Sequence, residues 1–185
     1  MEKPILFNTA MVRAILEGRK TQTRRLVKPQ GIKCYKGAYS KGYILSTTVN
    51  SMYCADILWV RETWQESECF DFHVKGKYAY LANDYENELS QEYKIKWRPS
   101  IHMPRAAARL FLRVTNVRVE RLQDITPDDC EKEGMDAWID DGVHDPGDAM
   151  YLQFKNLWDS VYKKQDFGWD VNPWVWVIDF ERVTA

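Results

Sequence analysis

The chain has 185 residues, of which 45% are hydrophobic and 29% are charged, and its formal net charge is -1. This length and composition are those of a single globular domain that buries enough surface to fold without disulfides or metals. A net charge near zero excludes a global basic field that could hold a long nucleic-acid duplex, so any nucleic-acid role must depend on a local patch.

Several functional classes are also excluded by what the sequence lacks. Its cysteines and histidines are scattered, and none of them has the spacing of zinc ligands. We therefore expect no metal, no cofactor and free thiols in a reducing compartment. The N-terminus lacks the apolar run of a signal peptide, and no stretch is long and apolar enough to span a membrane. The sequence predicts a soluble cytoplasmic protein without a membrane partner.

The chain is rich in large aromatic residues, with 8 tryptophans and 10 tyrosines. Such residues bury large areas, and they also supply flat faces on which bases can stack. Because large aromatic side chains are usually buried, we expect most of them in the core.

The first predicted element is a short amphipathic helix with Asn8 or Thr9 as its N-cap. Its apolar stripe has helical spacing and consists of Met11, Val12, Ile15 and Leu16. Gly18 ends this helix, because glycine enters the left-handed C-terminal geometry at little cost. Residues 19–25 are therefore expected to form a loop or an extended segment.

Strands are predicted in the middle of the chain. Residues 29–53 indicate loops and short hairpin strands. Residues 56–63 indicate a clear strand with Ile57, Trp59 and Arg61 on one face and Leu58, Val60 and Glu62 on the other. Residues 109–122 predict either one long strand with a bend near Asn116 or two strands.

Residues 65–104 are predicted to be an elaboration of the fold. They contain a hairpin around Gly76, with Val74 before the turn and Tyr78 and Tyr80 after it. An acidic, polar stretch follows at residues 83–92. Residues 97–104 contain two prolines and are expected to be non-helical.

The C-terminal third predicts two helices and a final strand. Thr126, Pro127 and Asp129 form the start of a short helix that Gly134 ends. A second helix begins near Asp148 and presents apolar residues at helical spacing, namely Tyr151, Phe154, Leu157, Trp158 and Val161. Residues 173–181 alternate as a central or closing strand. This order predicts an α+β fold with an antiparallel or mixed barrel and peripheral helices, in a single domain with elaborations at 29–53 and 65–104.

Six basic residues lie close together near the predicted end of the first helix, and Glu17 is the one acidic residue among them: Arg13, Arg19, Lys20, Arg24, Arg25 and Lys28. Such a cluster attracts phosphate or another anion, and arginine adds planar donors that also stack on bases. The alternative is a solvated helix end whose cations offset the helix dipole.

The spacing of Gly18, Lys20, Thr23 and Arg25 fits G-x-K-x-x-T-x-R, which resembles the signature of the ASCH family. These are small β-barrel domains similar to the PUA domains of RNA-modifying enzymes. Residues 56–64 and 125–134 resemble a strand and a helix of the family, and residues 97–104 and 169–180 resemble the longer members carried by phages and prophages. With these segments, the resemblance covers most of the chain. The resemblance implies a PUA-like mixed β-barrel whose cleft lies beside the first helix, in a protein of the bacterial host cytoplasm.

The function that the resemblance implies is binding of RNA or of a nucleotide or modified nucleoside through the loop of residues 18–25. The expected ligand-binding residues are Gly18, Arg19, Arg24, Arg25 and Arg61. The acidic stretch at residues 84–92 repels a long polyanion and favours a ligand of nucleotide size.

An alternative implied by the resemblance is an amidohydrolase, because one compact branch of the family removes the acetyl group from acetylated cytidine. Its catalytic residues correspond to Lys20, Thr23 and Glu133. A threonine hydroxyl needs a base to take its proton, and the neighbouring arginines lower the pKa of Lys20 while the helix end opposes them. Glu133 then passes a proton to the leaving amine.

Simpler roles stay open for the same three residues. In these alternatives Lys20 only binds a phosphate and Thr23 is a strand residue whose side chain is bonded to the backbone. Glu133 then forms an ion pair with a basic residue such as Arg25. This chain is also longer than the compact amidohydrolases, and its elaborations are expected around the cleft. A third function is that of a phage structural or assembly protein, in which the basic loop is incidental.

Overall fold

The structure is a computed structural model that describes residues 1–27, 57–66, 77–84, 96–136 and 146–183. The hairpins predicted at residues 29–53 and most of the acidic stretch lie outside these ranges. The chain divides into two compact units. Unit 1 contains residues 1–18, 55–113 and 182–185, and unit 2 contains residues 19–54 and 114–181.

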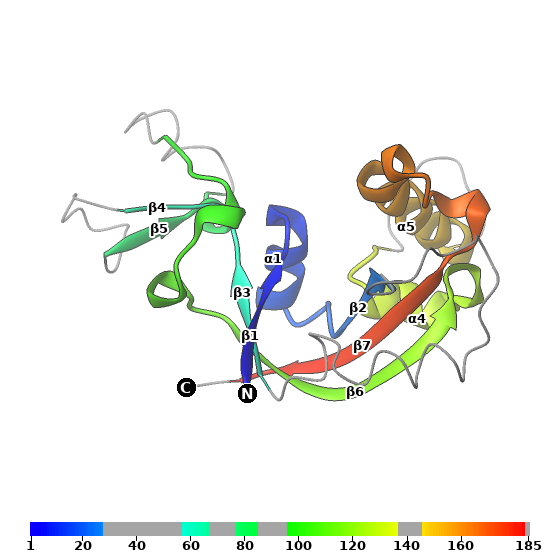
Figure 1. Cartoon of the computed structure of the whole chain (residues 1–185), viewed down its shortest axis with the longest axis horizontal. Coiled ribbons are helices and arrows are strands. Elements are labelled where there is room, and N and C mark those ends of the chain that lie inside the picture. The colour runs from blue at the N-terminus through cyan, green and yellow to red at the C-terminus, as the bar shows by residue number, and fades with distance from the viewer. Residues whose placement is uncertain (28–56, 67–76, 85–95, 137–145, 184–185) are drawn as a thin grey trace, which may run out of the picture. The chain divides into compact units, whose positions relative to one another are not determined.

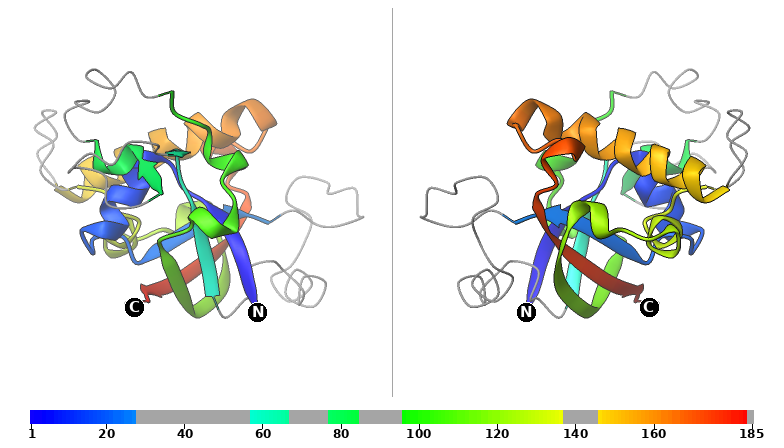
Figure 2. Two further views of the ribbon diagram at one scale, coloured as in Figure 1. Left: turned by 90° about the vertical axis from the view of Figure 1, so that its left-hand side faces the viewer. Right: turned by 90° about the vertical axis from the view of Figure 1, so that its right-hand side faces the viewer.

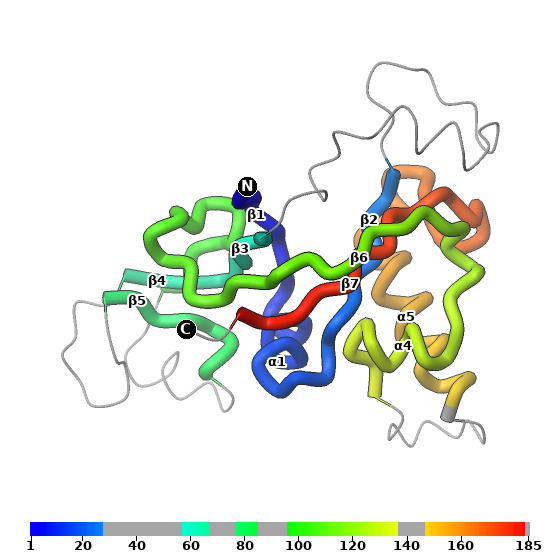
Figure 3. Tube along the Cα trace, turned by 90° about the horizontal axis from the view of Figure 1, so that it is seen from below, coloured from blue at the N-terminus to red at the C-terminus, as the bar shows by residue number. Residues whose placement is uncertain are grey.

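Five strands form a mixed sheet in the order β1-β3-β6-β7-β2 (Figure 1). Their bounds are Glu2–Leu6 for β1, Gln22–Leu26 for β2, Ile57–Arg61 for β3, Phe111–Arg121 for β6 and Trp174–Arg182 for β7. β1 runs parallel to β3, whereas β3 is antiparallel to β6 and β2 is antiparallel to β7. The long strands β6 and β7 lie side by side (Figure 3).

The sheet confirms the predicted mixed α+β class. Among the described strands, β1 and β2 are the two edges, and no pairing between these residues closes the sheet into a barrel. β6 is one continuous strand, which decides between the two predicted alternatives. β1 was not predicted, because Pro4 interrupts its apolar pattern and its partner β3 is distant in sequence.

Unit 1 begins with the predicted helix, α1 (Thr9–Leu16). The Asn8 side chain accepts a hydrogen bond of 2.8 Å from the Met11 amide, which satisfies a free donor of the first turn. Gly18 follows the helix with φ of 79°, the left-handed conformation that glycine adopts cheaply. The sequence therefore identified both ends of this helix correctly.

Unit 1 also contains a two-stranded sheet of β4 (Trp64–Glu66) and β5 (Tyr78–Tyr80), which are antiparallel. Tyr78 and Tyr80 lie in a strand, as predicted, and its partner is β4; Val74 and Gly76, which define the predicted hairpin, lie outside the described residues. Three short 3-10 turns accompany them: η1 (Leu81–Asn83), η2 (Ser100–His102) and η3 (Arg105–Ala107). The segment 97–104, predicted to be non-helical, thus contains one such turn.

Unit 2 contains helix α4 (Pro127–Lys132) and the longer helix α5 (Pro146–Tyr162), which pack together (Figure 2). The predicted capping box of Thr126 and Asp129 is present, and Gly134 has φ of 88°. Short 3-10 turns complete the unit: η4 (Leu122–Asp124), η5 (Lys163–Gln165) and η6 (Trp169–Val171).

The core of unit 2 lies between α4, α5 and the strands β2 and β7. Phe154 and Trp158 of α5 are buried there with Trp169, as the helical spacing predicts. Val161 is an exception, since 46% of it is exposed at the end of the helix. In the part of the chain described here, none of the helices could cross a membrane, because each is too short or too polar.

Candidate functional site

The segment 19–25 enters β2, where its side chains alternate between the two faces of the sheet. Backbone hydrogen bonds of 2.9 Å hold its first residues: Thr21 N–H donates to Lys132 O, and Phe180 N–H donates to Thr21 O. β2 pairs with β7 so that Gln22 lies opposite Asp179. The sequence segment predicted to be functional is therefore fixed between α4 and the sheet of unit 2.

Lys20 and Glu133, two of the three predicted catalytic residues, are in direct contact. Lys20 Nζ donates to Glu133 Oε2 and to the Glu133 carbonyl oxygen, both at 2.7 Å. Their side chains are 0% and 2% exposed. Glu133 occupies the C-cap of α4, where helix carbonyls and the dipole favour a cation. Thr23 is buried on β2, three residues after Lys20.

The environment of Lys20 lowers the pKa of its ammonium group. The main cause is burial, which removes the charged form from water. The carboxylate of Glu133 opposes this effect, and the charges of Arg25 and Arg24 add smaller downward contributions. The expected arginine repulsion is present, but the sequence did not reveal the larger effect of burial.

Arg24 is buried in a cluster of acidic side chains rather than exposed to a ligand. Its Nη2 lies 3.0 Å from Asp129 Oδ2 and 3.5 Å from Glu120 Oε2, and its Nη1 lies 3.4 Å from Glu133 Oε1. Nη1 also donates to the Gln22 side-chain oxygen. Glu133 thus pairs with Lys20 and Arg24, whereas the sequence reasoning suggested Arg25.

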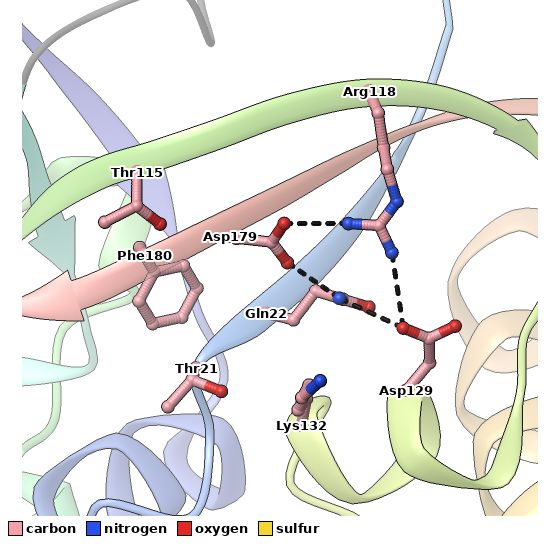
Figure 4. Close-up of a pocket in the computed structure, with 8 residues that line it drawn as sticks. All are labelled: Thr21, Gln22, Thr115, Arg118, Asp129, Lys132, Asp179 and Phe180. Carbon is pink, nitrogen blue, oxygen red and sulfur yellow. Dashed lines mark hydrogen bonds and ion pairs between the residues drawn. The ribbon is translucent and has the colours of Figure 1, made fainter.

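A pocket of about 330 Å³ opens beside this cluster (Figure 4). Its lining comes from β2 and the residue before it, and from β6, α4 and β7. It consists of Thr21, Gln22, Thr115, Arg118, Asp129, Lys132, Asp179 and Phe180. Gln22 Nε2 donates to Asp179 Oδ1 at 2.7 Å and to Asp129 Oδ1 at 3.1 Å. These bonds fix the carboxamide in the pocket wall.

Arg118 connects the other side of the pocket wall. Its Nη1 donates to Asp179 Oδ2 at 2.7 Å, its Nη2 to Asp129 Oδ1 at 3.3 Å and its Nε to Glu120 Oε1 at 2.6 Å. Partial burial alone would lower the pKa of Arg118, but its hydrogen bonds with Glu120 and Asp179 outweigh this and raise it. The guanidinium is therefore a fixed positive charge at the rim.

The pocket lining carries equal numbers of opposite charges. Arg118 and Lys132 are positive, and Asp129 and Asp179 are negative. Burial raises the pKa of Asp129, but hydrogen bonds from Thr126 and the charge of Arg24 outweigh it and lower the pKa overall. Asp129 is thus ionised at neutral pH, and the formal charges of these four side chains sum to zero.

The remaining predicted binding residues are dispersed. Arg19 is exposed and donates to the Gly134 carbonyl at 3.1 Å, while Arg25 is half-buried on β2. Gly18 and Arg61 belong to unit 1. None of the residues predicted for catalysis or binding lines the pocket; Thr21 and Gln22 contribute to it from the same segment.

Sequence reasoning missed Gln22, Arg118 and Asp179 as site residues, and it treated Asp129 only as a helix cap. One signal was present, because Asp179 interrupts the apolar alternation of β7. Within the described ranges, no group of three or more potential ligands could hold a metal ion. No protein-family model, no curated protein and no solved structure matches this chain.

Proposed function

We propose that the chain is a PUA-like, ASCH-type barrel domain of the bacterial cytoplasm that binds a nucleoside or nucleotide through the segment of residues 18–25. The observation that carries this proposal is the pocket beside β2. Its volume of about 330 Å³ lies at the lower end of the range typical of small-molecule sites. Its donors, acceptors and the Phe180 ring are the groups that recognise the edge and the face of a base.

The charges favour a small ligand over a long RNA. The pocket lining is neutral in sum, and Lys20 and Arg24 are neutralised by buried carboxylates. Of the segment's cations, Arg19 is the exposed one. A polyphosphate gains little attraction from such a surface, whereas an uncharged nucleoside needs the polar groups that the pocket presents.

The test is calorimetric titration with cytidine, acetylated cytidine and cytidine monophosphate. Thr115 is an exposed residue of β6 that lines the pocket, so Thr115→Trp should fill part of the pocket with a large ring. Ser160→Trp is the control, because it places the same side chain at an exposed position of α5 that does not line the pocket. We expect wild type and Ser160→Trp to bind at least one of these compounds and Thr115→Trp to lose binding. Absence of binding by wild type, or equal binding by Thr115→Trp, would refute the proposal.

A second candidate is hydrolysis of an amide on an acylated nucleoside, a non-peptide C–N bond, by Lys20, Thr23 and Glu133. The supporting observation is the buried contact of 2.7 Å between Lys20 and Glu133, together with the lowered pKa of Lys20. A lysine with a lowered pKa can accept the proton of a threonine hydroxyl, and a carboxyl beside it can pass a proton to the leaving amine. Because all three side chains are buried, a substrate reaches them only if this region opens.

Incubation with acetylated cytidine and chromatography for cytidine and acetate tests this candidate. We expect Lys20→Ala and Thr23→Val to abolish turnover and Thr23→Ser, which keeps a hydroxyl, to retain part of it. Absence of turnover by wild type, or turnover that survives Lys20→Ala, would reject this mechanism and leave the binding function unaffected.

A further inference from the structure

The carboxylate of Glu133 is held from two sides by buried cations. Lys20 Nζ lies 2.7 Å from Glu133 Oε2, and Arg24 Nη1 lies 3.4 Å from the other oxygen, Oε1. The side chains of Lys20 and Arg24 are both 0% exposed, and that of Glu133 is 2% exposed. Rotation of the carboxylate would break at least one of these contacts. The direction of Oε2 towards Lys20 therefore depends on Arg24 as well as on Lys20.

Arg24 is itself fixed by neighbours from three elements. Its Nη2 lies 3.0 Å from Asp129 Oδ2 of α4 and 3.5 Å from Glu120 Oε2 of β6. Its Nη1 donates to the side-chain oxygen of Gln22 on the same strand, β2. A planar guanidinium held at both Nη atoms has little freedom to turn. Arg24 can thus act as a rigid support for Glu133.

Stability alone does not explain an arginine at position 24. Within the described part of the chain, its buried Nε has no hydrogen-bond acceptor. A buried donor without an acceptor costs stability, and apolar residues can often replace buried ion pairs without loss. Local features that cost stability are expected at functional sites. The effect of Arg24 on Glu133 and Lys20 gives a reason for its presence.

The charges that act on Lys20 come from α4 and β2. Glu133 at the end of α4 favours the ammonium form, whereas Arg25 and Arg24 of β2 disfavour it, and burial disfavours it most. The thiol of Cys130 on α4 is influenced by Arg24 and Glu133, but burial raises its pKa to about 11, so it is uncharged at lower pH. Loss of Arg24 would remove a repulsive charge and leave the Glu133 carboxylate to Lys20. Both changes should raise the pKa of Lys20.

We propose that Arg24 is a positioning residue for the Lys20–Glu133 pair. Its guanidinium holds Oε1 of Glu133, directs Oε2 to Lys20 Nζ, and shares the negative charge that would otherwise retain the proton on Lys20. Its catalytic meaning rests on the second candidate function, in which Lys20 accepts the proton of the Thr23 hydroxyl. Position 24 is a variable position of the pattern G-x-K-x-x-T-x-R, so the family resemblance gives it no part in catalysis.

Nuclear magnetic resonance of protein labelled with carbon-13 at lysine Cε tests the inference without substrate. The Lys20 signal is identified by its absence from Lys20→Met and is followed through its titration. We expect a midpoint below 10.5, the ordinary value for lysine, in wild type. Arg24→Met removes the guanidinium but keeps an unbranched side chain, and it should move the midpoint upward. Arg24→Lys keeps the positive charge and should restore a midpoint below 10.5.

Arg121→Met is the matched control. Arg121 also belongs to unit 2 and is partly buried, but it contacts the Trp174 ring and the Asn172 carbonyl rather than Glu133. Its loss should leave the Lys20 midpoint as in wild type. Arg24→Gln, which keeps an amide donor for the carboxylates, takes the place of Arg24→Met if circular dichroism shows that variant to be unfolded. An unchanged midpoint in the folded Arg24 variant, or an equal shift in Arg121→Met, would overturn the inference.

Kinetics separates the failure of this inference from the failure of the hydrolase candidate. If acetylated cytidine is hydrolysed, the rising limb of kcat against pH should move upward in Arg24→Met together with the Lys20 midpoint. Turnover below the midpoint should fall about tenfold for each pH unit of this shift. Absence of turnover by wild type would reject the hydrolase and leave the effect of Arg24 on Lys20 to the spectroscopic test. Turnover by wild type with an unmoved limb and midpoint in Arg24→Met would reject the role of Arg24 alone.

Discussion

The buried pair of Lys20 and Glu133 gives a prediction whose size follows from the structure. Their charged atoms are 2.7 Å apart, and the side chains are 0% and 2% exposed. Glu133→Gln keeps the shape of the side chain but removes its charge, which leaves the Lys20 ammonium buried without its main counter-charge. Breaking a buried pair in this way costs about 3–5 kcal/mol. Folded proteins are stable by only about 5–15 kcal/mol, so the loss is a large fraction of the total.

Urea denaturation followed by circular dichroism measures this loss. The midpoint should fall at unchanged slope, and the melting temperature should fall by about 6–20 °C for a protein of this size. Lys132→Gln is the control, because it breaks an ion pair that is exposed rather than buried. Lys132 Nζ lies 2.6 Å from Asp128 Oδ2, and both side chains are exposed. An exposed pair is screened by water, so the control should show no measurable shift.

A double variant separates the charge effect from the packing effect. Lys20→Met with Glu133→Leu removes both charges, and we expect it to be more stable than Glu133→Gln, because no charge is left alone. Arg24 loses its contact of 3.4 Å with Glu133 but keeps Asp129 at 3.0 Å. If Glu133→Gln is no less stable than Lys132→Gln, or if the double variant is as unstable as Glu133→Gln, the electrostatic reasoning is refuted.

Three further predictions concern the same unit. Burial raises the pKa of Asp129, but hydrogen bonds from Thr126 and the charge of Arg24 lower it below 3.8 overall. Its ionisation therefore stabilises the fold above pH 3.8, and this contribution is lost as the pH falls through the lowered pKa, so Asp129→Asn should flatten the acid side of a melting-temperature series. Burial raises the pKa of Cys130 to about 11, so peptide mass spectrometry should find it unreacted with iodoacetamide at pH 8 until urea is added; rapid labelling of the folded protein would contradict this. Gly134→Ala should cost about 1–2 kcal/mol in urea denaturation, because its φ of 88° is unfavourable for alanine, and a neutral effect would count against that strain.

The helix ends could be predicted from sequence because their signals are local. Asn8 and Gly18 delimit α1, and Thr126 and Gly134 delimit α4, each through contacts within a few residues. The alternation of β3, β6 and β7 was equally visible. β1 was missed because an edge strand containing Pro4 is stabilised by a parallel partner distant in sequence.

The site was only partly predictable, since its contacts are long-range. The family resemblance selected Lys20 and Glu133 together, and the structure brings them into contact across 113 positions of sequence. Periodicity could not show that Gln22 faces Asp179, because that depends on the register between β2 and β7. For the same reason the sequence did not reveal that Arg24 is buried among carboxylates rather than exposed to a phosphate.

The two candidate functions share one hydrogen-bonded network. Gln22 lines the pocket and accepts a hydrogen bond from Arg24, and Arg24 contacts Glu133, the partner of Lys20. If the proposed binding function holds, a ligand that draws Gln22 into its own hydrogen bonds should change the environment of Arg24, and through Arg24 the electrostatic environment of Lys20. Apolar residues can often replace a buried ion pair without loss of stability, so stability alone is a weak reason for its presence. The position of Lys20 and Glu133 next to the pocket lining gives a stronger reason for the presence of the pair. Buried charges and shifted pKa values concentrate at functional sites.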